Sequence, residues 1–215
     1  MASRPETPQE RAHHWNSVHL DGDESGHTWF QLRPSIALEL LEFLGVKASS
    51  AFLDVGGGES NLVDHLLMMN FSDVTVLDIS PEAIENSQRR VGVNHRVTWI
   101  TEDLLSWRSS RRFDVWHDRA VFHFLTGDEV NDYRSMILRT LTDDGLVILA
   151  TFAPTGPEYC SGLPVHRYAT SELASFLGCD FEIVANRSEV HVTPSGVEQP
   201  FSWIAAQRRK SASTE

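Results

Sequence analysis

"AFLDVGGGES", residues 51–60, begins as an apolar run and ends in three consecutive glycines. The apolar part predicts a short buried strand, and the glycines predict a tight turn before a helix that Ser60 caps. Turns of this kind bring the backbone close to a nucleotide. The dinucleotide fingerprint needs glycines at its first, third and sixth positions, but counted from Gly56 the sixth position is Asn61. Asp54 would also repel a pyrophosphate, so the turn argues against NAD.

Length and composition indicate one domain. The chain has 215 residues, of which 41% are hydrophobic, enough for one sizeable core and too few for two. We therefore expect a single domain over residues 1–215. Residues 1–12 and 208–215 are polar and are expected to be loose termini. Residues 13–45 are expected to form an N-terminal lid segment followed by a helix.

Charge and cysteine content restrict the partners and the compartment. The formal net charge is -12, from 18 basic and 30 acidic residues, which would repel a nucleic acid backbone. The sequence has neither an apolar run long enough to cross a membrane nor the pattern of a secretion signal. The cysteines Cys160 and Cys179 show no metal-ligand spacing, so we predict reduced thiols in the cytoplasm and no metal site.

Strand and helix patterns alternate along the chain, which predicts an α/β fold with a mostly parallel sheet and helices on both faces. The last two strands flank a turn near Pro194 and are expected to form an antiparallel hairpin. The predicted strands cover residues 51–55, 74–78, 96–100, 113–118, 145–152, 181–193 and 199–207. The predicted helices cover residues 34–45, 60–69, 128–141 and 171–177, and a further helix begins at Ser80 and Pro81.

Three consecutive predicted strands each have an acidic residue at or just after the carboxyl end: Asp54, Asp78 and Asp103. Each alone is as easily an ordinary turn residue. Together they favour a ligand site, because the carboxyl ends of parallel strands meet at one edge of a sheet.

The segments that hold these acids, "DVGGGES", "VLDIS" and "TEDL", resemble the three cofactor motifs of class I S-adenosylmethionine-dependent methyltransferases. The resemblance covers roughly residues 30–207 and implies a Rossmann-like fold with a seven-stranded sheet and S-adenosyl-L-methionine as cofactor. It implies that the glycine turn faces the methionine part, that Asp78 accepts hydrogen bonds from the ribose, and that Asp103 and the backbone of Leu104 contact the adenine. The cofactor-binding residues expected on this basis are Asp54, Gly56, Gly57, Gly58, Asp78, Ile79, Glu102, Asp103, Leu104, His117 and Trp29.

The methyl acceptor is expected at the segments that line it in the family, here residues 116–125, 153–168 and 27–31. Methyl transfer needs alignment, exclusion of water and, for a protonated acceptor, a base. His117 and His123 are the candidate bases, although most histidines only pack or hydrogen-bond. Arg119 is expected either to pair with Asp118 or to bind an anionic acceptor such as a thiolate.

"WHDRAVFHFL", residues 116–125, resembles the corresponding stretch of thiopurine and tellurite-resistance methyltransferases, and also that of elongation-factor lysine methyltransferases. We therefore expect a small acceptor with a thiol or another soft nucleophile. The alternatives are a protein lysine N-methyltransferase and a catalytically inactive cofactor-binding protein. Residues 116–119 lack the Asn-Pro-Pro-Tyr-like run of nucleic acid amino methylation. The chain is expected to be a monomer or a homodimer.

Overall fold

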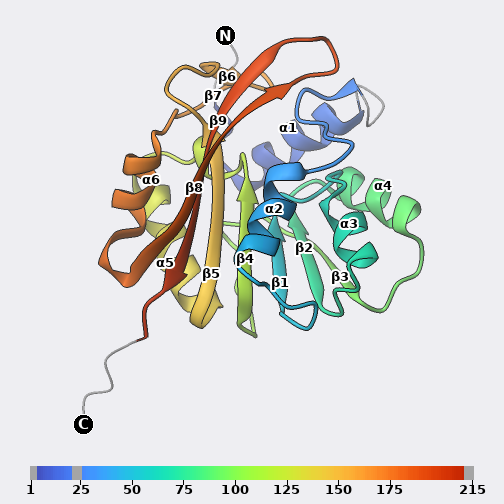
Figure 1. The fold of residues 1–215 in the computed structure, drawn as a ribbon. Coiled ribbons are helices and arrows are strands. Elements are labelled where there is room, and N and C mark those ends of the chain that lie inside the picture. Colours follow the sequence, from blue (N-terminus) through green and yellow to red (C-terminus); the bar gives the residue numbers. More distant parts are fainter. Residues whose placement is uncertain (1–3, 21–25, 211–215) are drawn as a thin grey trace.

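The computed structural model describes residues 4–20 and 26–210. In this part of the chain, seven strands form one twisted sheet with helices on both faces (Figure 1). The strand order is β3-β2-β1-β4-β5-β9-β8. The first five of these pair in parallel, and β9 pairs antiparallel with both β5 and β8. The prediction of a mostly parallel sheet with an antiparallel C-terminal hairpin is confirmed.

The strands of this sheet lie close to their predicted positions. They are β1 (Phe52–Val55), β2 (Val74–Asp78), β3 (Val97–Thr101), β4 (Phe113–Arg119), β5 (Leu141–Phe152), β8 (Phe181–Val192) and β9 (Glu198–Arg208). The short strands β6 (Tyr159–Cys160) and β7 (Leu163–Pro164) form a small separate hairpin within the loop predicted over residues 153–168.

The helices bury two hydrophobic cores, one on each face of the sheet. Alternation along the strands supplies both cores: Phe52 faces one, and its neighbour Leu53 faces the other. Helices α2, α3 and α4 pack on the face of Phe52, and α5 and α6 pack on the face of Leu53. The bounds are α2 (Ser35–Phe43), α3 (Leu62–Met68), α4 (Pro81–Val91), α5 (Asp128–Thr140) and α6 (Thr170–Leu177), with 3-10 turns η2 (Phe122–Phe124) and η3 (Gly178–Asp180).

The N-terminal region differs from its prediction. Residues 1–12 were expected to be loose, but a helix, α1 (Pro8–Leu20), begins within them. A capping box starts this helix, because Thr7 Oγ1 accepts from the Glu10 amide at 3.2 Å and a Glu10 carboxylate oxygen accepts from the Thr7 amide at 3.0 Å. The helix has few apolar residues at helical spacing, so periodicity gave no signal. Residues 1–3, 21–25 and 211–215, which belong to the predicted termini and lid, lie outside the described residues.

The hairpin of β8 and β9 extends beyond the sheet and contacts the segment that follows α1 (Figure 1). His191 Nε2 lies 2.8 Å from the carbonyl oxygen of Thr28, and Gln31 donates to Glu189 at 2.6 Å. The N-terminal segment is therefore held over the carboxyl ends of the strands.

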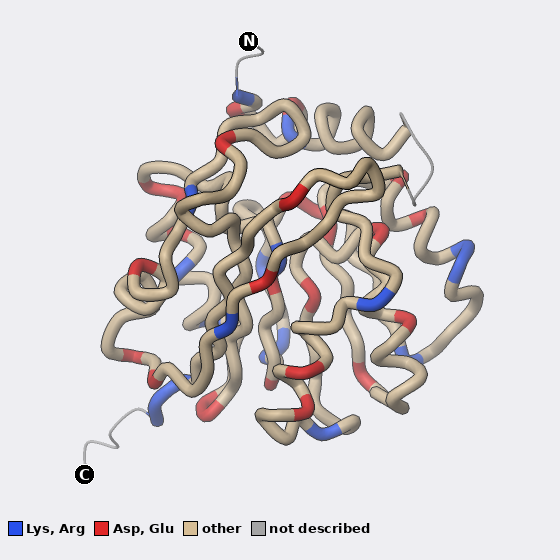
Figure 2. The backbone as a smooth tube through the Cα atoms, turned by 45° about the horizontal axis from the view of Figure 1, so that its top comes forward, with Lys and Arg blue, Asp and Glu red and all other residues tan. Residues whose placement is uncertain are grey.

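Charged residues of both signs are scattered along the described backbone (Figure 2). Lysine and arginine do not collect on one element. Among the described residues, no helix is both long enough and apolar enough to cross a lipid bilayer.

A buried polar network joins β4 to α5. Asp118 accepts from the amides of Val121 at 2.8 Å and Phe122 at 3.0 Å, and from the Tyr133 hydroxyl. That hydroxyl accepts in turn from the Trp116 indole at 3.0 Å. Burial raises the pKa of Asp118 to about 6, although the three donors and His117 oppose the shift.

Ser80 caps α4, so replacing it tests the cap. Its hydroxyl accepts from the Ala83 amide at 3.2 Å and is fully buried. Ser80→Ala leaves this amide unpaired and is expected to lower the free energy of unfolding by about 1–2 kcal/mol in urea titrations. Ser175→Ala in α6, an exposed hydroxyl bonded to the Ser171 carbonyl, is the matched control and should change stability by under about 0.5 kcal/mol. Equal losses in the two variants would contradict the cap.

Asp118 predicts a pH dependence of stability. Between pH 3.8 and about 6 the folded state keeps a proton on Asp118 that the unfolded state releases, so stability falls as the pH rises through this window. Above it, the folded state carries a buried carboxylate at a cost of about 3 kcal/mol. Asp118→Asn cannot titrate at this position. The difference in unfolding free energy, variant minus wild type, should therefore rise by about 3 kcal/mol between pH 4 and 7.

The comparison uses urea titrations at each pH, in which any constant offset from the altered hydrogen bonds cancels. Asp132→Asn, an exposed carboxylate on α5, is the control and should follow wild type. A parallel pH profile for Asp118→Asn and wild type would show that Asp118 does not titrate in this window.

Candidate functional site

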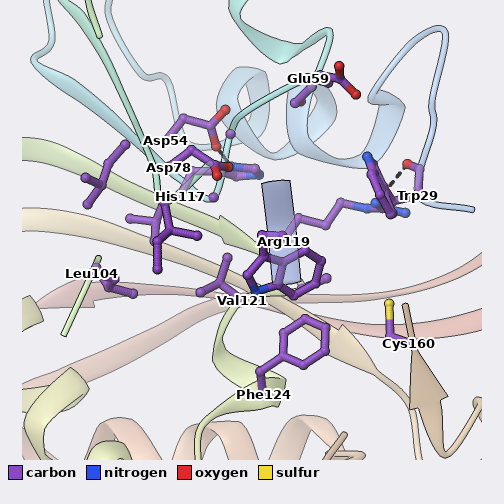
Figure 3. Close-up of a pocket in the computed structure, with 18 of the residues that line it drawn as sticks. Trp29, Asp54, Glu59, Asp78, Leu104, His117, Arg119, Val121, Phe124 and Cys160 are labelled. Atoms are coloured by element: carbon purple, nitrogen blue, oxygen red, sulfur yellow. Dashed lines mark hydrogen bonds and ion pairs between the residues drawn. The ribbon is translucent and has the colours of Figure 1, made fainter. Parts of the chain in front are cut away.

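A cavity of about 190 Å³ opens at the carboxyl ends of β1, β2, β3 and β4 (Figure 3). This edge is where ligands bind in open α/β sheets. Helix α1 contributes to the same cavity through Arg11, Trp15 and His19. The predicted site residues that line it are Trp29, Asp54, Gly56, Gly57, Asp78, Ile79, Glu102, Asp103, Leu104, His117 and Arg119. Gly58 and His123, also predicted, are not among the lining residues.

The three glycines allow two carboxylates to approach the turn. Gly56 has a φ of +67°, a conformation that other residues rarely adopt. A Cβ on Gly57 would lie 2.4 Å from Oδ2 of Asp54, and a Cβ on Gly58 would lie 2.7 Å from Oδ2 of Asp78. Any side chain at these two positions would push the carboxylates away. Gly58 therefore positions the site, although it does not line the cavity.

Asp54 and His117 form a buried pair across neighbouring strands. They stand opposite each other in the β1–β4 register, and His117 Nδ1 lies 2.7 Å from Asp54 Oδ1. Within the described part of the chain, the second carboxylate oxygen of Asp54 has no hydrogen-bond partner, and the same holds for His117 Nε2. The pair thus orients the imidazole and leaves one acceptor atom on each residue unsatisfied.

Asp78 ends β2 beside the glycine turn. Its carboxylate accepts from the Gly58 amide at 3.0 Å and the Ser80 amide at 2.9 Å. Burial raises the pKa of Asp78, which the backbone amides and His19 partly oppose. Each carboxylate oxygen can accept a further hydrogen bond, so the residue can bind a donor in the cavity.

Asp103, after β3, has a partner that the sequence did not indicate. One of its carboxylate oxygens accepts from the Leu105 amide at 2.8 Å. The other lies 2.8 Å from Nε and 2.7 Å from Nη2 of Arg11 in α1. The N-terminal helix is therefore tied to the third strand at one end of the cavity.

Arg119 extends across the cavity toward Trp29 (Figure 3). Its Nη1 donates to the Trp29 carbonyl at 3.3 Å, and its guanidinium lies 4.4 Å from the centre of the Phe201 ring. Its Nε and Nη2 are buried and have no hydrogen-bond acceptor among the residues described. Burial lowers the pKa of Arg119, and the nearby Glu189 partly offsets this shift. The cavity thus contains a cation with two donor nitrogens, Nε and Nη2, that have no acceptor among the described residues.

The predicted alternative of an Arg119–Asp118 ion pair is wrong. Adjacent residues of β4 point to opposite faces of the sheet, so Asp118 joins Tyr133 in the opposite core. Asp54 and His117 share the Arg119 side instead.

His123 also differs from its prediction as a general base. Its ring is fully buried between Phe124 and Phe152, at centroid distances of 4.4 Å and 4.9 Å. Burial and the charge of Arg119 lower its pKa to about 3, so it is neutral at pH 7. His123 lies outside the cavity, so we interpret it as a histidine packed in the core.

The opposite side of the cavity from Asp54 and Asp78 is formed by aromatic residues and Cys160 (Figure 3). Trp15 packs edge-on against Phe124 with centroids 5.0 Å apart. Burial raises the pKa of the Cys160 thiol to about 11, so it is not a thiolate at neutral pH.

A cluster that sequence reasoning missed joins the lid to the glycine turn. Oε2 of Glu59 lies 2.9 Å from His19 Nδ1 and 3.2 Å from His27 Nε2. Its other oxygen accepts from Asn86. Burial raises the pKa of Glu59, but hydrogen bonds from His19 and Asn86 outweigh it, so the pKa lies below its usual range. These residues have no fixed spacing, and only the fold brings them together.

Comparisons with known proteins agree with the fold. Residues 53–147 match the model of a family described as a methyltransferase domain. No curated protein sequence matches the chain. Among solved structures, the 1,6-didemethyltoxoflavin N1-methyltransferase of Burkholderia thailandensis, with bound S-adenosylhomocysteine, is 22% identical with a TM-score of 0.72, over 98% of this chain and 94% of that one.

Two further structures are similar. One, from work on the conversion of a disulfide bond into a thioacetal group during echinomycin biosynthesis, is 19% identical with a TM-score of 0.72, over 94% of this chain and 95% of that one. The N-methyltransferase NodS of Bradyrhizobium japonicum is 15% identical with a TM-score of 0.70, over 91% and 98%. These solved structures show that the chain shares their fold, and the family match shows that residues 53–147 are similar to a methyltransferase domain.

Proposed function

We propose that this chain methylates a small anionic acceptor, such as a thiolate or another soft nucleophile. The observation that carries the proposal is the guanidinium of Arg119, which has unpaired buried donors in the cavity. The comparisons support the enzyme class, whereas the acceptor and the residue roles rest on the geometry described above.

S-adenosylmethionine would bind with its methionine part at the glycine turn. The unsatisfied oxygen of Asp54 suits the ammonium of the methionine part, and the glycines leave room for it. Asp78 would accept hydrogen bonds from the ribose hydroxyls. Asp103, with Glu102 and the backbone of Leu104, would hold the adenine, and Ile79 would pack on its face. S-adenosylmethionine supplies an electrophilic methyl group on a sulfonium.

A buried cation suits an anionic acceptor for an electrostatic reason. Removing an unpaired charge from water is costly, and a bound anion with hydrogen-bond acceptors offsets that cost. Arg119 can donate from Nε and Nη2 to such a group. The protonated amine of a lysine would instead bring a second positive charge beside the guanidinium, which disfavours the lysine alternative.

The coverage of the cavity supports a small acceptor. Helix α1, the segment around Trp29 and the β6–β7 hairpin all contribute lining residues, including Trp15 and Cys160. Aromatic walls exclude water and suit a polarisable nucleophile. Two of the similar structures are named for N-methyltransferases and one for sulfur chemistry, so they support a small molecule without selecting the atom that is methylated.

His117 is the candidate group for an acceptor that enters as a thiol. Its Nδ1 proton is directed to Asp54, which leaves Nε2 free to take the thiol proton. The Asp54 carboxylate would then stabilise the imidazolium. An acceptor that is already a thiolate needs only alignment by Arg119.

Asp78→Ala tests the cofactor site. Loss of the ribose contacts is expected to weaken S-adenosylhomocysteine binding by about 1–3 kcal/mol, or 5- to 150-fold, in isothermal titration calorimetry. Asp73→Ala is the matched control, because this carboxylate lies at the other end of β2 and pairs with Arg111 on the surface. Unchanged affinity in a folded Asp78→Ala protein would show that Asp78 does not bind the cofactor. Asp78→Asn, which keeps the volume of the side chain, serves if the alanine variant unfolds.

Arg119→Gln tests the acceptor site. With S-adenosylmethionine labelled at its methyl group and a panel of sulfide and small thiols, the variant is expected to lower kcat/KM by about 10- to 100-fold, because it loses charge-assisted hydrogen bonds to the acceptor. Arg119→Lys should retain part of the activity, and affinity for S-adenosylhomocysteine should not change. The control is Arg167→Gln, an exposed arginine that pairs with Glu158 outside the cavity.

The same labelled cofactor, incubated with a cell lysate, separates the alternatives. Label confined to protein bands would overturn the small-acceptor proposal in favour of the lysine reading. Tight binding of S-adenosylhomocysteine with no label in either fraction would indicate a cofactor-binding protein without catalysis.

A further inference from the structure

We propose that His19, His27 and Glu59 form a binding site for a divalent transition metal, which fastens the N-terminal lid to the glycine turn. One nitrogen of each histidine and a carboxylate oxygen all lie within 4.8 Å of one another. The three side chains come from the last turn of α1, the segment after residue 25 and the turn after β1. A metal bound there would connect three parts of the chain that are distant in sequence.

The spacing of the ligand atoms fits a tetrahedral metal. Bonds of about 2.0–2.2 Å in a tetrahedron place ligand atoms about 3.3–3.6 Å apart. The two histidine nitrogens lie 2.9 Å and 3.2 Å from the same Glu59 oxygen. Small outward shifts of these side chains would therefore admit an ion, with a water as the fourth ligand. Two imidazoles and one carboxylate suit Zn²⁺ and Co²⁺ better than hard cations such as Mg²⁺.

The residues around the cluster hold the ligands in place. The Trp29 indole stacks on the His27 ring at 4.4 Å with an interplanar angle of 6°, and it also lies edge-on to His19 at 5.3 Å. Asn86 donates to the Glu59 oxygen that faces away from the histidines. Outer contacts of this kind orient the ligands of metal sites. All three side chains are at most 9% exposed, and the negative charge of Glu59 would offset part of the cost of removing the ion from water.

The cluster borders the cofactor cavity. His19, Glu59 and Trp29 all line that cavity, and Glu59 lies on the same side of it as Trp29 (Figure 3). A metal that fixes α1 against the glycine turn would hold the lid in its closed arrangement. Binding of the metal and binding of the cofactor should therefore strengthen each other, and this coupling is reciprocal. The metal site itself does not depend on which acceptor is methylated.

The test titrates Zn²⁺ into the full chain after removal of metals with a chelator. Wild type is expected to bind one equivalent in calorimetry, and Co²⁺ should give the visible absorption of a four- or five-coordinate site. Glu59→Gln should weaken Zn²⁺ binding by about 100-fold or more, because it removes a charged ligand. His13→Ala, an exposed histidine on α1, is the matched control and should bind as wild type does. Equal affinity in wild type and Glu59→Gln would reveal an adventitious ion only and overturn the site.

Melting temperatures provide a second test, which remains valid if Glu59→Gln folds poorly. Zn²⁺ should raise the melting temperature of wild type, and it should leave that of His27→Gln unchanged, because only the folded protein with all ligands gains from binding. One equivalent of Zn²⁺ should also tighten S-adenosylhomocysteine binding about 5-fold or more. An equal rise in melting temperature for wild type and His27→Gln, or Zn²⁺ binding with no effect on S-adenosylhomocysteine, would overturn the proposed link between lid and turn.

Discussion

The close approach of two carboxylates to the glycine turn is the constraint on which the site depends. Asp54 and Asp78 lie so near the backbone of Gly57 and Gly58 that a Cβ would come within 2.4 Å and 2.7 Å of their oxygens. The Gly58 amide fixes the Asp78 carboxylate, and Asp54 fixes the imidazole of His117. The glycine turn thus determines where the side chains at the ends of β1, β2 and β4 lie. A bulkier turn would push these two carboxylates away from the positions that they hold beside the cavity.

The sequence predicted the parts of the molecule that depend on local pattern. Alternating strand and helix signals located the sheet because buried strands and amphipathic helices have distinct periods, and the acids at the strand ends followed from that order. Helix α1 was missed because its apolar residues have no helical period, although Thr7 and Glu10 carry a capping signature that could have indicated its start. Its ion pair from Arg11 to Asp103 had no signal, since long-range partners have no fixed spacing.

The residues of β4 also show that local sequence pattern does not determine the surroundings of a side chain. His117, Asp118 and Arg119 are consecutive, yet only the first and third face the cavity, because side chains alternate along a strand. The sequence alone does not show which residues of β4 face the cavity and which face the opposite core. His123 was plausible by type and position, but burial lowers its pKa to about 3 and places it in the core. Chemistry at such positions is set by solvent exposure, which depends on the whole fold.

Helix α1 contacts both ends of the cavity, and this arrangement relates closure of the lid to occupancy of the site. Arg11 near its start pairs with Asp103, and His19 in its last turn binds Glu59. Each contact places a side chain of α1 on an acid of a strand end or of the glycine turn, and both acids line the cavity. Movement of α1 away from the sheet would remove a charged or hydrogen-bonding partner from each of these acids. The contacts that hold α1 against the sheet therefore depend on acids that also line the cavity, so the position of the helix and the charge of the cavity are linked.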